Sequence, residues 1–543
     1  MTTAERQLLS GDDAVALAAL HAGVRLGTGY PGTPSTEILE TFDRLGGHAQ
    51  WSPNEKVALE VALGVAFAGS RTLVTMKHVG LNVAADPLFT ATYTDVEGGL
   101  VIVSADDPGM ASSQNEQDNR HYSRAAAIPT LEPVDSQQAY DFTLLEFEIY
   151  ERWKIPVMLR ITTRVCHSKT IVIPRGPVSG VAEPAFERRI PARVMIPAYA
   201  KPAHHRLRTK LAEIAAWNEA EGPVRMNAGD SELGIVTSGI SAVHAREAAP
   251  DASHLTIGMT YPLPIERIRA FAAGLERLVV VEEGDPVLVD ELRAAGIQAE
   301  GKPEMYRFGE LDVARVRRIL AGDTSPEPVP PKGKPPELCQ GCAHREVFQA
   351  LRDLDCIVAG DIGCYTLGVL PPFSAMDTCV CMGASIGVGL GLRHVLPEDQ
   401  ARRVVSVIGD STFVHSGLTG IAEMVYNPPA TGHLVMILDN GTTAMTGLQE
   451  HPGTGRLLDH STTNKMSFEG IARAMGVQNV QVVETTDKSL SLKDLIAELL
   501  AKPETSLLIT RQPCVLAAPK IRFYDKAAAE SAQLQSCAAA VSG

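Results

Sequence analysis

Short apolar runs that alternate with alanine-rich stretches are the strongest constraint on how this chain folds. The runs are rich in Val, Ile and Leu, and they lie at residues 72–76, 100–104, 157–161, 233–238, 278–282, 404–408, 434–438 and 507–510. Runs that are apolar on both faces are typical of strands buried in parallel sheets, with helices as the connections. The sequence therefore predicts an α/β protein with several doubly wound parallel-sheet domains.

Size and charge narrow the possible functions. A chain of 543 residues is too long for one core and suits three or four domains. A net charge of −15 argues against a nucleic-acid partner, because no basic surplus is present to neutralise phosphates. Residues 1–14 lack the apolar centre of a signal peptide, and no apolar stretch is long enough to span a bilayer. We therefore expect a cytoplasmic protein without a membrane partner.

Proline-rich segments suggest where the domains end. Residues 322–336 (GDTSPEPVPPKGKPP) are almost free of large apolar side chains and indicate a stiff linker. Residues 173–205 also carry many prolines and few strand signals. The expected order is an N-terminal α/β domain, a connecting segment, a middle α/β domain, the linker, a C-terminal α/β domain and a tail that frays after Ala527. Their expected ranges are residues 1–170, 171–230, 231–321, 322–336, 337–521 and 522–543.

Two strand ends carry oxygen ligands. The run at 404–408 is followed by Gly409-Asp410-Ser411, and the run at 434–438 by Asp439-Asn440-Gly441. The carboxyl ends of strands are where open α/β sheets bind ligands, and carboxylate and amide oxygens beside a diphosphate suit Mg²⁺. The alternative is a pair of ordinary turns, in which Gly-Asp and Asp-Asn are common.

These turns resemble the motif of thiamine-diphosphate enzymes, in which GDG is followed further along by NN. The resemblance implies that Asp410, Asn440 and the backbone carbonyl of Thr442 hold Mg²⁺, and that Gly409 and Ser411 bind the cofactor. Ser411 stands where the motif usually has glycine, and Asp439 where it has asparagine. Neither position normally supplies a side chain to the metal, so the metal site is expected to survive both changes.

A longer segment resembles one family within this group. Ala444-Met445-Thr446-Gly447-Leu448-Gln449 is similar to the GMTGGQ segment of 2-oxoacid:ferredoxin oxidoreductases. The resemblance adds Met445 and Thr446 to the expected cofactor-binding residues.

The N-terminal third shows the same resemblance. Tyr30-Pro31-Gly32-Thr33-Pro34-Ser35 is similar to the YPITPS turn of the family's pyrimidine-binding domain, where the threonine contacts substrate, so Thr33 is the candidate here. Glu55 opens an alanine-rich helix expected to end near Gly64, like the helix whose first acid activates the cofactor by a charge-assisted hydrogen bond to the pyrimidine ring. Glu60, one turn later, is the competitor, and a solvated acid favoured by the helix dipole is the alternative.

The cysteines form a third pattern. The chain has nine, an odd number, so a disulfide framework is not expected. Cys339 and Cys342 form a C-x-x-C pair after the linker, Cys364 ends a strand-like segment and Cys514 follows the last strand. By spacing alone, zinc, an iron–sulfur cluster or plain packing would fit.

The family resolves the cysteine pattern by resemblance. Its catalytic subunits hold a [4Fe–4S] cluster near the thiamine with C-x-G-C, GIGC and a late PC, which match Cys339 and Cys342, Cys364, and Cys514. These four are the expected cluster ligands. The remaining cysteines have no matched role and are expected to be packing residues; they are Cys166, Cys356, Cys379, Cys381 and Cys537.

Three further side chains are weaker candidates. The guanidinium of Arg120 would suit the carboxylate of a 2-oxo acid by bidentate hydrogen bonding, and a solvated loop arginine is the alternative. His78 follows a predicted strand and would lie near the cofactor rings, unless it is a structural histidine. His344, close to Cys342, could hydrogen-bond near the cluster.

Taken together, the resemblance covers about residues 8–520 in the order pyrimidine domain, transketolase-C-like middle domain and diphosphate domain. With the segments Lys77–Asn82 (KHVGLN) and Cys339–Arg345 (CQGCAHR), the chain looks most like the family of large (alpha) subunits of indolepyruvate:ferredoxin oxidoreductase. Those subunits commonly end in a ferredoxin-like domain with two C-x2-C-x2-C-x3-C runs, whereas only Cys537 follows Cys514 here. At most one cluster is therefore expected, with electrons leaving through another protein.

The resemblance implies a function. We expect oxidative decarboxylation of an aryl-pyruvate-type, indolepyruvate-like 2-oxo acid to an acyl-coenzyme A, with electrons passing through the cluster to ferredoxin or another acceptor. A small (beta) subunit would complete a hetero-oligomer, and no coenzyme A module is recognisable in this chain. Two alternatives stay open: a non-oxidative thiamine-dependent decarboxylase or carboligase, and a catalytically silent electron-transfer or assembly subunit.

Overall fold

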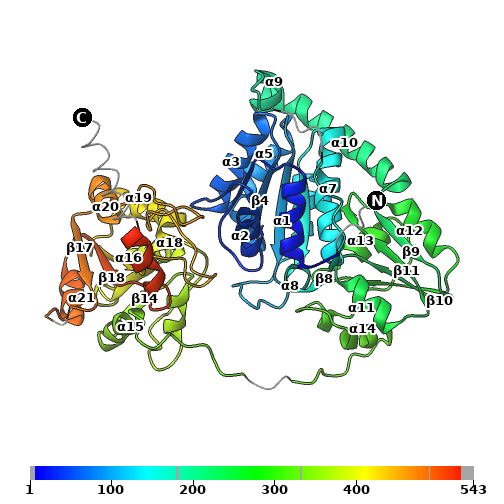
Figure 1. The fold of residues 1–543 in the computed structure, drawn as a ribbon. Helices are drawn as coiled ribbons and strands as arrows, with labels where there is room; N and C mark the ends of the chain where they lie inside the picture. Colours follow the sequence, from blue (N-terminus) through cyan, green and yellow to red (C-terminus); the bar gives the residue numbers. More distant parts are fainter. Residues whose placement is uncertain (1–5, 179–182, 330–332, 488, 528–543) are drawn as a thin grey trace. The chain divides into compact units, whose positions relative to one another are not determined.

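The computed structural model describes residues 6–178, 183–329, 333–487 and 489–527, and the alanine-rich end expected to fray lies outside them. The chain forms two compact units, residues 1–329 and 330–543 (Figure 1). Every apolar run predicted as a strand lies wholly or largely within a strand of the structure. Each of these strands pairs with at least one parallel neighbour. The predicted α/β class with parallel sheets is confirmed.

The first unit contains a seven-stranded sheet in the order β12-β6-β7-β5-β4-β2-β3. The strands are β2 (Leu26–Gly29), β3 (Ala49–Trp51), β4 (Thr72–Lys77), β5 (Leu100–Asp106), β6 (Thr130–Leu131), β7 (Val157–Thr162) and β12 (Met259–Tyr261). All pairs are parallel except β12 with β6. Strand β12 comes from the predicted middle domain, so the N-terminal and middle segments share this sheet.

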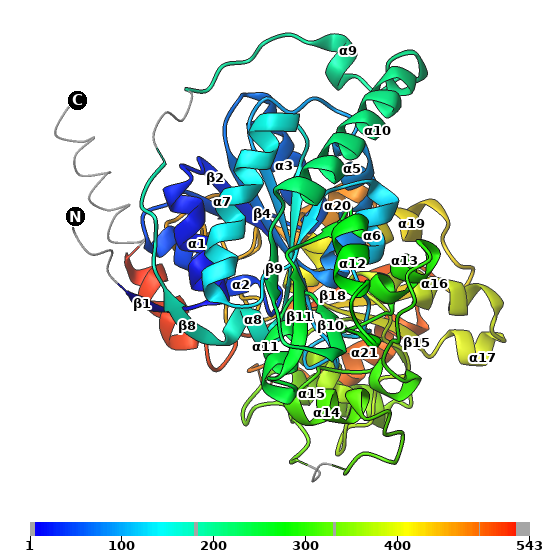
Figure 2. The same ribbon diagram turned by 90° about the vertical axis from the view of Figure 1, so that its right-hand side faces the viewer.

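Helices cover both faces of this sheet, with α1 and α7 packed together (Figures 1 and 2). The elements are α1 (Gly11–His21), α2 (Thr36–Arg44), α3 (Glu55–Phe67), α4 (His78–Val83), α5 (Ala85–Ala91), α6 (Arg120–Ala126), α7 (Ser136–Trp153) and α8 (Thr163–His167), with β1 (Gln7–Ser10) and β8 (Lys169–Val172) as a separate antiparallel pair. The expected end of α3 near Gly64 was wrong. A helical glycine costs only about 1 kcal/mol, and burial of Ala62 and Ala66 on either side offsets it.

The predicted connecting segment is more ordered than its prolines suggested. It contains α9 (Ile190–Arg193) and the 24-residue helix α10 (Pro197–Ala220). Pro197 sits in the first turn, where proline needs no N–H partner, and the helix continues past Pro202. Burial of Ala203, Leu207, Leu211 and Ile214 along one face holds it to the unit.

A second sheet of the first unit has the order β13-β10-β11-β9. Its strands are β9 (Val224–Asn227), β10 (Asp230–Thr237), β11 (Ala252–Ile257) and β13 (Arg277–Val281), and its helices are α11 (Ser241–Ala248), α12 (Ile265–Ala272), α13 (Val287–Ala294) and α14 (Val313–Leu320), with a 3-10 turn η1 (Glu304–Tyr306). Most of these elements lie within the expected middle segment, residues 231–321, but β9 comes from the end of the expected connecting segment.

The second unit is built on a five-stranded parallel sheet in the order β14-β15-β16-β18-β17. The strands are β14 (Ile357–Ala359), β15 (Val404–Gly409), β16 (His433–Asp439), β17 (Asn479–Glu484) and β18 (Thr505–Arg511). The helices are α15 (His344–Asp353), α16 (Ala384–Val395), α17 (Glu398–Ala401), α18 (Asp410–Thr412), α19 (Leu418–Tyr426), α20 (Phe468–Met475) and α21 (Leu492–Ala501), with short turns η2 (Cys364–Val369) and η3 (Phe413–Gly417).

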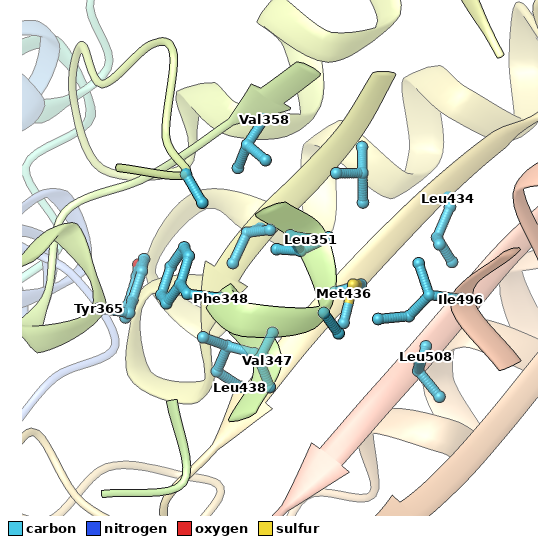
Figure 3. Packing of buried hydrophobic residues seen from close by; sticks show 14 of the residues in the cluster. Val347, Phe348, Leu351, Val358, Tyr365, Leu434, Met436, Leu438, Ile496 and Leu508 are labelled. Atoms are coloured by element: carbon cyan, nitrogen blue, oxygen red, sulfur yellow. The ribbon is translucent and has the colours of Figure 1, made fainter. Parts of the chain in front are cut away.

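Successive residues of β16 enter opposite cores, as a doubly wound sheet requires. Leu434, Met436 and Leu438 pack with α15 and α21 (Figure 3), while Val435 and Ile437 pack on the other face with α16, α19 and α20. Both faces of the sheet are therefore dry. In the part of the chain that the structure describes, no helix is both long and apolar enough to cross a membrane.

Buried charges tie the two sheets of the first unit together. Arg120 Nη2 lies 2.5 Å from Asp118 Oδ2, and its Nη1 lies 2.5 Å from Glu282 Oε2, at the end of β13. Arg160 on β7 pairs with Asp106 at 2.7 Å and with Glu132 at 3.0 Å. Burial alone would raise the pKa of Asp118, but the two guanidinium groups hold it well below its usual range.

We predict that Arg120→Met destabilises the first unit by about 3–5 kcal/mol, because it leaves buried carboxylates without their partner. The control is Arg164→Met, which removes a partly exposed pair with Glu310 and is expected to cost about 0–1 kcal/mol. Urea unfolding of the full chain measures both. Equal losses in the two variants would show that the buried network does not hold the sheets together.

Candidate active site

The two predicted turns meet at the carboxyl edge of the second unit's sheet. Asp410 directly follows β15, and the register that pairs Gly409 with Leu438 places it beside the end of β16. Its buried carboxylate accepts hydrogen bonds from the backbone N–H groups of Asn440 (3.2 Å) and Gly441 (2.8 Å). The strand-end rule therefore brought together residues thirty positions apart.

The Asp410 carboxylate is held in its charged form. Burial alone would raise its pKa, but His451, whose Nε2 lies 3.3 Å from Oδ2, and the surrounding N–H donors hold the pKa below its usual value. Asn440 Oδ1 accepts from the backbone N–H of Thr442 at 3.1 Å, which orients the amide. A charged carboxylate beside a fixed carboxamide oxygen is a donor set that fits Mg²⁺.

The departures from the motif have local explanations. Asp439, in place of asparagine, pairs with Arg511 at 2.7 Å. The hydroxyl of Ser411, in place of glycine, accepts from Thr443 Oγ1 at 2.9 Å. Gly409 is required by packing, because a Cβ there would lie 2.6 Å from Cε1 of Tyr365. Neither substituted side chain removes an oxygen donor from Asp410 or Asn440.

The other residues predicted to bind the cofactor lie in the loop after β16. Thr442 is buried and donates its hydroxyl to the carbonyl of Gln449 at 3.2 Å, and the hydroxyl of Thr446 donates to Gln449 Oε1 at 2.7 Å. Met445 is 49% exposed. The structure orders this loop around Gln449, and the roles of Met445 and Thr446 stay predictions.

Sequence reasoning missed two residues at this edge. Asp361 is fully buried and accepts hydrogen bonds from the N–H groups of Gly383 (2.8 Å) and Ser385 (3.0 Å), which fixes the start of α16. Its position three residues before Cys364, at the start of the segment that resembles GIGC, was a usable signal. His451 had none, since a lone histidine in a loop says nothing about a partner 41 residues earlier.

The four predicted cluster cysteines approach the same edge from separate segments. The backbone N–H of Cys514 donates to the carbonyl of Asn440 at 2.9 Å, so this cysteine lies beside the metal-binding turn. Burial, followed by the neighbouring thiols of Cys514, Cys342 and Cys339, raises the pKa of Cys364 to about 11. The four thiols are thus close enough to influence one another's ionisation.

The spacing of these thiols is wider than in a mononuclear metal site. Four sulfurs bonded tetrahedrally to one zinc ion at about 2.3 Å would lie about 3.8 Å apart. Among the described residues, no cysteine belongs to a set of three or more ligand atoms that all lie within 4.8 Å of one another.

His344 connects the cysteine segment with the metal-binding turn. It is buried at the start of α15, two residues after Cys342, and its ring lies edge-on to Tyr365 at 6.0 Å. Burial lowers its pKa to about 4, although the charge of Asp410 acts in the opposite direction. A neutral imidazole therefore stands near Asp410, and its expected hydrogen bond near the cluster stays a prediction.

In the first unit, the structure distinguishes the two candidate acids on α3. Glu55 is 5% exposed, and its carboxylate lies against α4, where a Cβ on Gly80 would be 2.5 Å from Oε1. Glu60 is exposed and forms an ion pair with Lys56. Only Glu55 has the burial that a cofactor-activating acid needs.

Thr33 lies beside a lysine that sequence reasoning did not single out. Ser112 Oγ donates to the carbonyl of Thr33 at 3.4 Å, and Lys77 Nζ donates to the carbonyl of Ser112 at 2.6 Å. Burial lowers the pKa of Lys77 to about 8, with Asp107 at 4.0 Å acting in the opposite direction. Lys77 opens the segment KHVGLN, which the sequence had marked only as a family resemblance.

Arg120 and His78, the two other candidates in the first unit, are both buried but have different partners. Arg120 is buried, and its donors are taken up by Asp118, Glu282 and backbone carbonyls, so a substrate carboxylate would have to displace them. Its role as a substrate ligand stays a prediction, and these contacts count against it. His78 is fully buried, Nε2 lies 3.1 Å from the carbonyl of Asn115, and burial lowers its pKa, so the ring is neutral.

Two protein-family models match segments that contain most of these candidate residues. A family model described as "Thiamine pyrophosphate enzyme, C-terminal TPP binding domain" matches residues 361–510, and one described as "Pyruvate flavodoxin/ferredoxin oxidoreductase, thiamine diP-bdg" matches residues 17–205. The fold and site therefore define a thiamine-diphosphate-dependent 2-oxoacid oxidoreductase.

Curated relatives narrow the class. The chain is 36% identical to the indolepyruvate oxidoreductase subunit IorA of Archaeoglobus fulgidus, over 94% of this chain and 87% of the relative. It is 38% identical to the subunit of the same name from Methanothermobacter thermautotrophicus, over 95% of this chain and 88% of the relative. The chain belongs to the indolepyruvate oxidoreductase subunit IorA family.

A solved 2-oxoglutarate:ferredoxin oxidoreductase from Magnetococcus marinus is a more distant match. It is 17% identical and covers 59% of this chain and 65% of its own, with a TM-score of 0.49. This likeness is too weak to support a conclusion about the site.

We predict that Gly80→Ala displaces the Glu55 carboxylate while sparing the fold, because the added Cβ meets the movable end of that side chain. Hydrogen–deuterium exchange at C2 of bound thiamine diphosphate should slow, as in Glu55→Gln, within the roughly 10²- to 10⁴-fold range of acid–base contributions. Gly64→Ala on α3 is the matched control, since nothing lies within 4 Å of its Cβ. Normal exchange in both Gly80→Ala and Glu55→Gln would assign activation to another residue.

Proposed function

We propose that this chain catalyses the oxidative decarboxylation of an aryl-pyruvate-type 2-oxo acid, similar to indolepyruvate, to an acyl-coenzyme A. The observation that carries the proposal is the meeting of Asp410, Asn440 and Cys514 at one sheet edge. It combines a Mg²⁺ donor set with a cysteine of the predicted cluster. The substrate class follows from relatives named indolepyruvate oxidoreductase subunit.

The cofactor proposal assigns roles at the second unit's sheet edge. Thiamine diphosphate, when bound, would supply a nucleophilic carbon and a cationic ring that takes up the electrons left as CO₂ departs. The side chains of Asp410 and Asn440, with the backbone carbonyl of Thr442, would hold Mg²⁺ against its diphosphate. Gly409 and Ser411 would lie beside the diphosphate, and Met445 and Thr446 would bind the cofactor from the following loop.

The first unit would supply the acid and the substrate contacts. Glu55 would keep a shared proton at a pyrimidine ring nitrogen, since a buried carboxylic acid makes a short charge-assisted hydrogen bond. Thr33 would contact the substrate. Lys77 takes the place that the sequence had given to Arg120, because its buried ammonium lies near the Thr33 turn and suits a 2-oxo acid carboxylate. His78 would remain a neutral neighbour of this region.

Cys339, Cys342, Cys364 and Cys514 are proposed to hold one [4Fe–4S] cluster. All-thiolate sites suit both zinc and iron–sulfur clusters, and the wide spacing of these thiols favours the larger group. The cluster would pass electrons singly to ferredoxin or another acceptor protein. A small beta subunit would complete a hetero-oligomer in which coenzyme A receives the acyl group.

We predict that Asp410→Ala abolishes Mg²⁺-dependent binding of thiamine diphosphate, because it removes the charged metal ligand. Titration of the full chain with the cofactor, with and without Mg²⁺, measures the loss, and circular dichroism verifies the fold. Ser411→Gly is the control and should bind normally, since it restores the glycine usual at that position. Unchanged affinity in Asp410→Ala would refute the metal assignment.

We predict that Cys514→Ser lowers the iron and acid-labile sulfide of anaerobically purified protein and slows reduction of the acceptor more than release of CO₂. Cys356→Ser is the control. Its side chain is half-buried, burial raises its pKa to about 12, and its charged neighbours do not include the four cluster cysteines. Zinc that is bound without labile sulfide and is lost in Cys514→Ser would favour a non-oxidative thiamine enzyme.

A further inference from the structure

A second group of ligand atoms lies in the first unit, on residues to which the proposed reaction gives no role. Asp12 on α1, Glu37 on α2 and His167 at the end of α8 each offer one ligand atom, and these atoms all lie within 4.8 Å of one another. Helix α1 packs against both α2 and α8 (Figures 1 and 2). Among the described residues, this is the one group of three or more His, Cys, Asp or Glu atoms so close together.

Asp12 is the unusual member of the group. It is 1% exposed, and neither carboxylate oxygen has a hydrogen-bond partner by strict geometry among the described residues. A buried carboxylate without a cationic partner or a strong hydrogen-bond donor is costly in its charged form, so it must bind a proton or a cation. Burial, followed by the charge of Glu37, raises the pKa of Asp12 well above its usual value.

No basic side chain in the described part of the chain neutralises this group. Among the described residues, neither Asp12 nor Glu37 forms an ion pair with a lysine or arginine. The nearby Arg44 pairs with Asp13, the residue next to Asp12, at 3.6 Å. The thiol of Cys166 lies against Asp12, but burial raises its pKa, so it stays protonated and can only donate a weak hydrogen bond. The two carboxylates and one imidazole thus face each other without a fixed positive charge.

We propose that Asp12, Glu37 and His167 form a binding site for a divalent transition-metal cation of the zinc type. Zinc bonds nitrogen and oxygen at about 2.0–2.2 Å, so ligand atoms even on opposite sides of the ion lie within about 4.4 Å of each other. The three ligand atoms lie within 4.8 Å of one another, so a small movement of the two exposed side chains, Glu37 and His167, would bring them to this separation. An imidazole with two carboxylates suits zinc or its neighbours, whereas Mg²⁺ and Ca²⁺ prefer oxygen ligands alone.

The surroundings give the ion access and a structural role. Glu37 and His167 are exposed, so a hydrated ion can enter and keep water at the remaining positions. Helix α2 begins directly after the Tyr30–Ser35 turn, which contains Thr33. A bound cation would join the starts of α1 and α2 to the end of α8 and so restrain that turn.

The test uses the full chain with its cofactors, stripped of loosely bound metal and titrated with zinc chloride in a calorimeter. Wild type should bind one zinc ion that His167→Gln binds at least about tenfold more weakly. The matched control is His121→Gln, an exposed histidine 2.7 Å from a single carboxylate, Asp285. It should bind zinc like wild type.

Proton release gives a second readout. Because burial raises the pKa of Asp12, zinc binding should be accompanied by proton release, which titrations in buffers of different ionisation enthalpy detect. Zinc should raise the melting temperature of wild type but not of Asp12→Asn, which keeps the side-chain shape. Equal zinc binding by wild type and His167→Gln would overturn the proposal. A second combination of results would also overturn the proposal: Asp12→Asn is more stable than wild type without metal, and zinc fails to stabilise wild type. Asp12 and Glu37 would then be a carboxyl pair that shares a proton.

Zinc bound at the four-cysteine site can be distinguished from zinc bound by Asp12, Glu37 and His167. Zinc held by those thiols is lost in Cys514→Ser and kept in His167→Gln, whereas zinc at the proposed site shows the opposite pattern. Failure of the cluster assignment and failure of this proposal are therefore separate outcomes.

Discussion

The hydrogen bonds from the backbone of Asn440 and Gly441 to the buried carboxylate of Asp410 are the contact on which the second unit's site depends. They fix one strand end against the next, and each further part of the site is attached to one of these turns. Cys514 donates to the Asn440 carbonyl, and the pKa of His344 responds to the charge of Asp410. A parallel sheet makes this possible, because it brings the carboxyl ends of all its strands to one edge.

The first unit depends instead on buried opposite charges. Arg120 reaches from α6 to Glu282 at the end of β13, and Arg160 on β7 binds Asp106 and Glu132. Replacing one member leaves the other buried charges without a partner, which is strongly destabilising. This holds even though replacing the whole network by apolar side chains could leave the stability unchanged. The network also takes up the donors of Arg120, while Lys77 lies outside it and contacts Ser112.

Much of the fold and part of the site could be predicted from local sequence. Strand runs were predictable because burial on both faces demands apolar residues at every position, and Asp410 with Asn440 followed from the strand-end rule. The continuation of α3 past Gly64 and the whole of α10 were missed, because glycine and proline signals are local whereas the burial that overrides them is tertiary. The partner of Arg120 was equally unpredictable, since Glu282 lies 162 residues further along the chain.

The sequence by itself determined the alternation of strands and helices and which residue types follow each strand, and so the class of chemistry. Only the tertiary structure decided between side chains of the same type. Glu55 is buried against Gly80 while Glu60 faces Lys56, and Asp12 meets Glu37 and His167 from three separate helices. The reason is physical: a side chain's charge state and partners depend on burial and on neighbours brought from distant parts of the chain, and neither is written in the residues beside it.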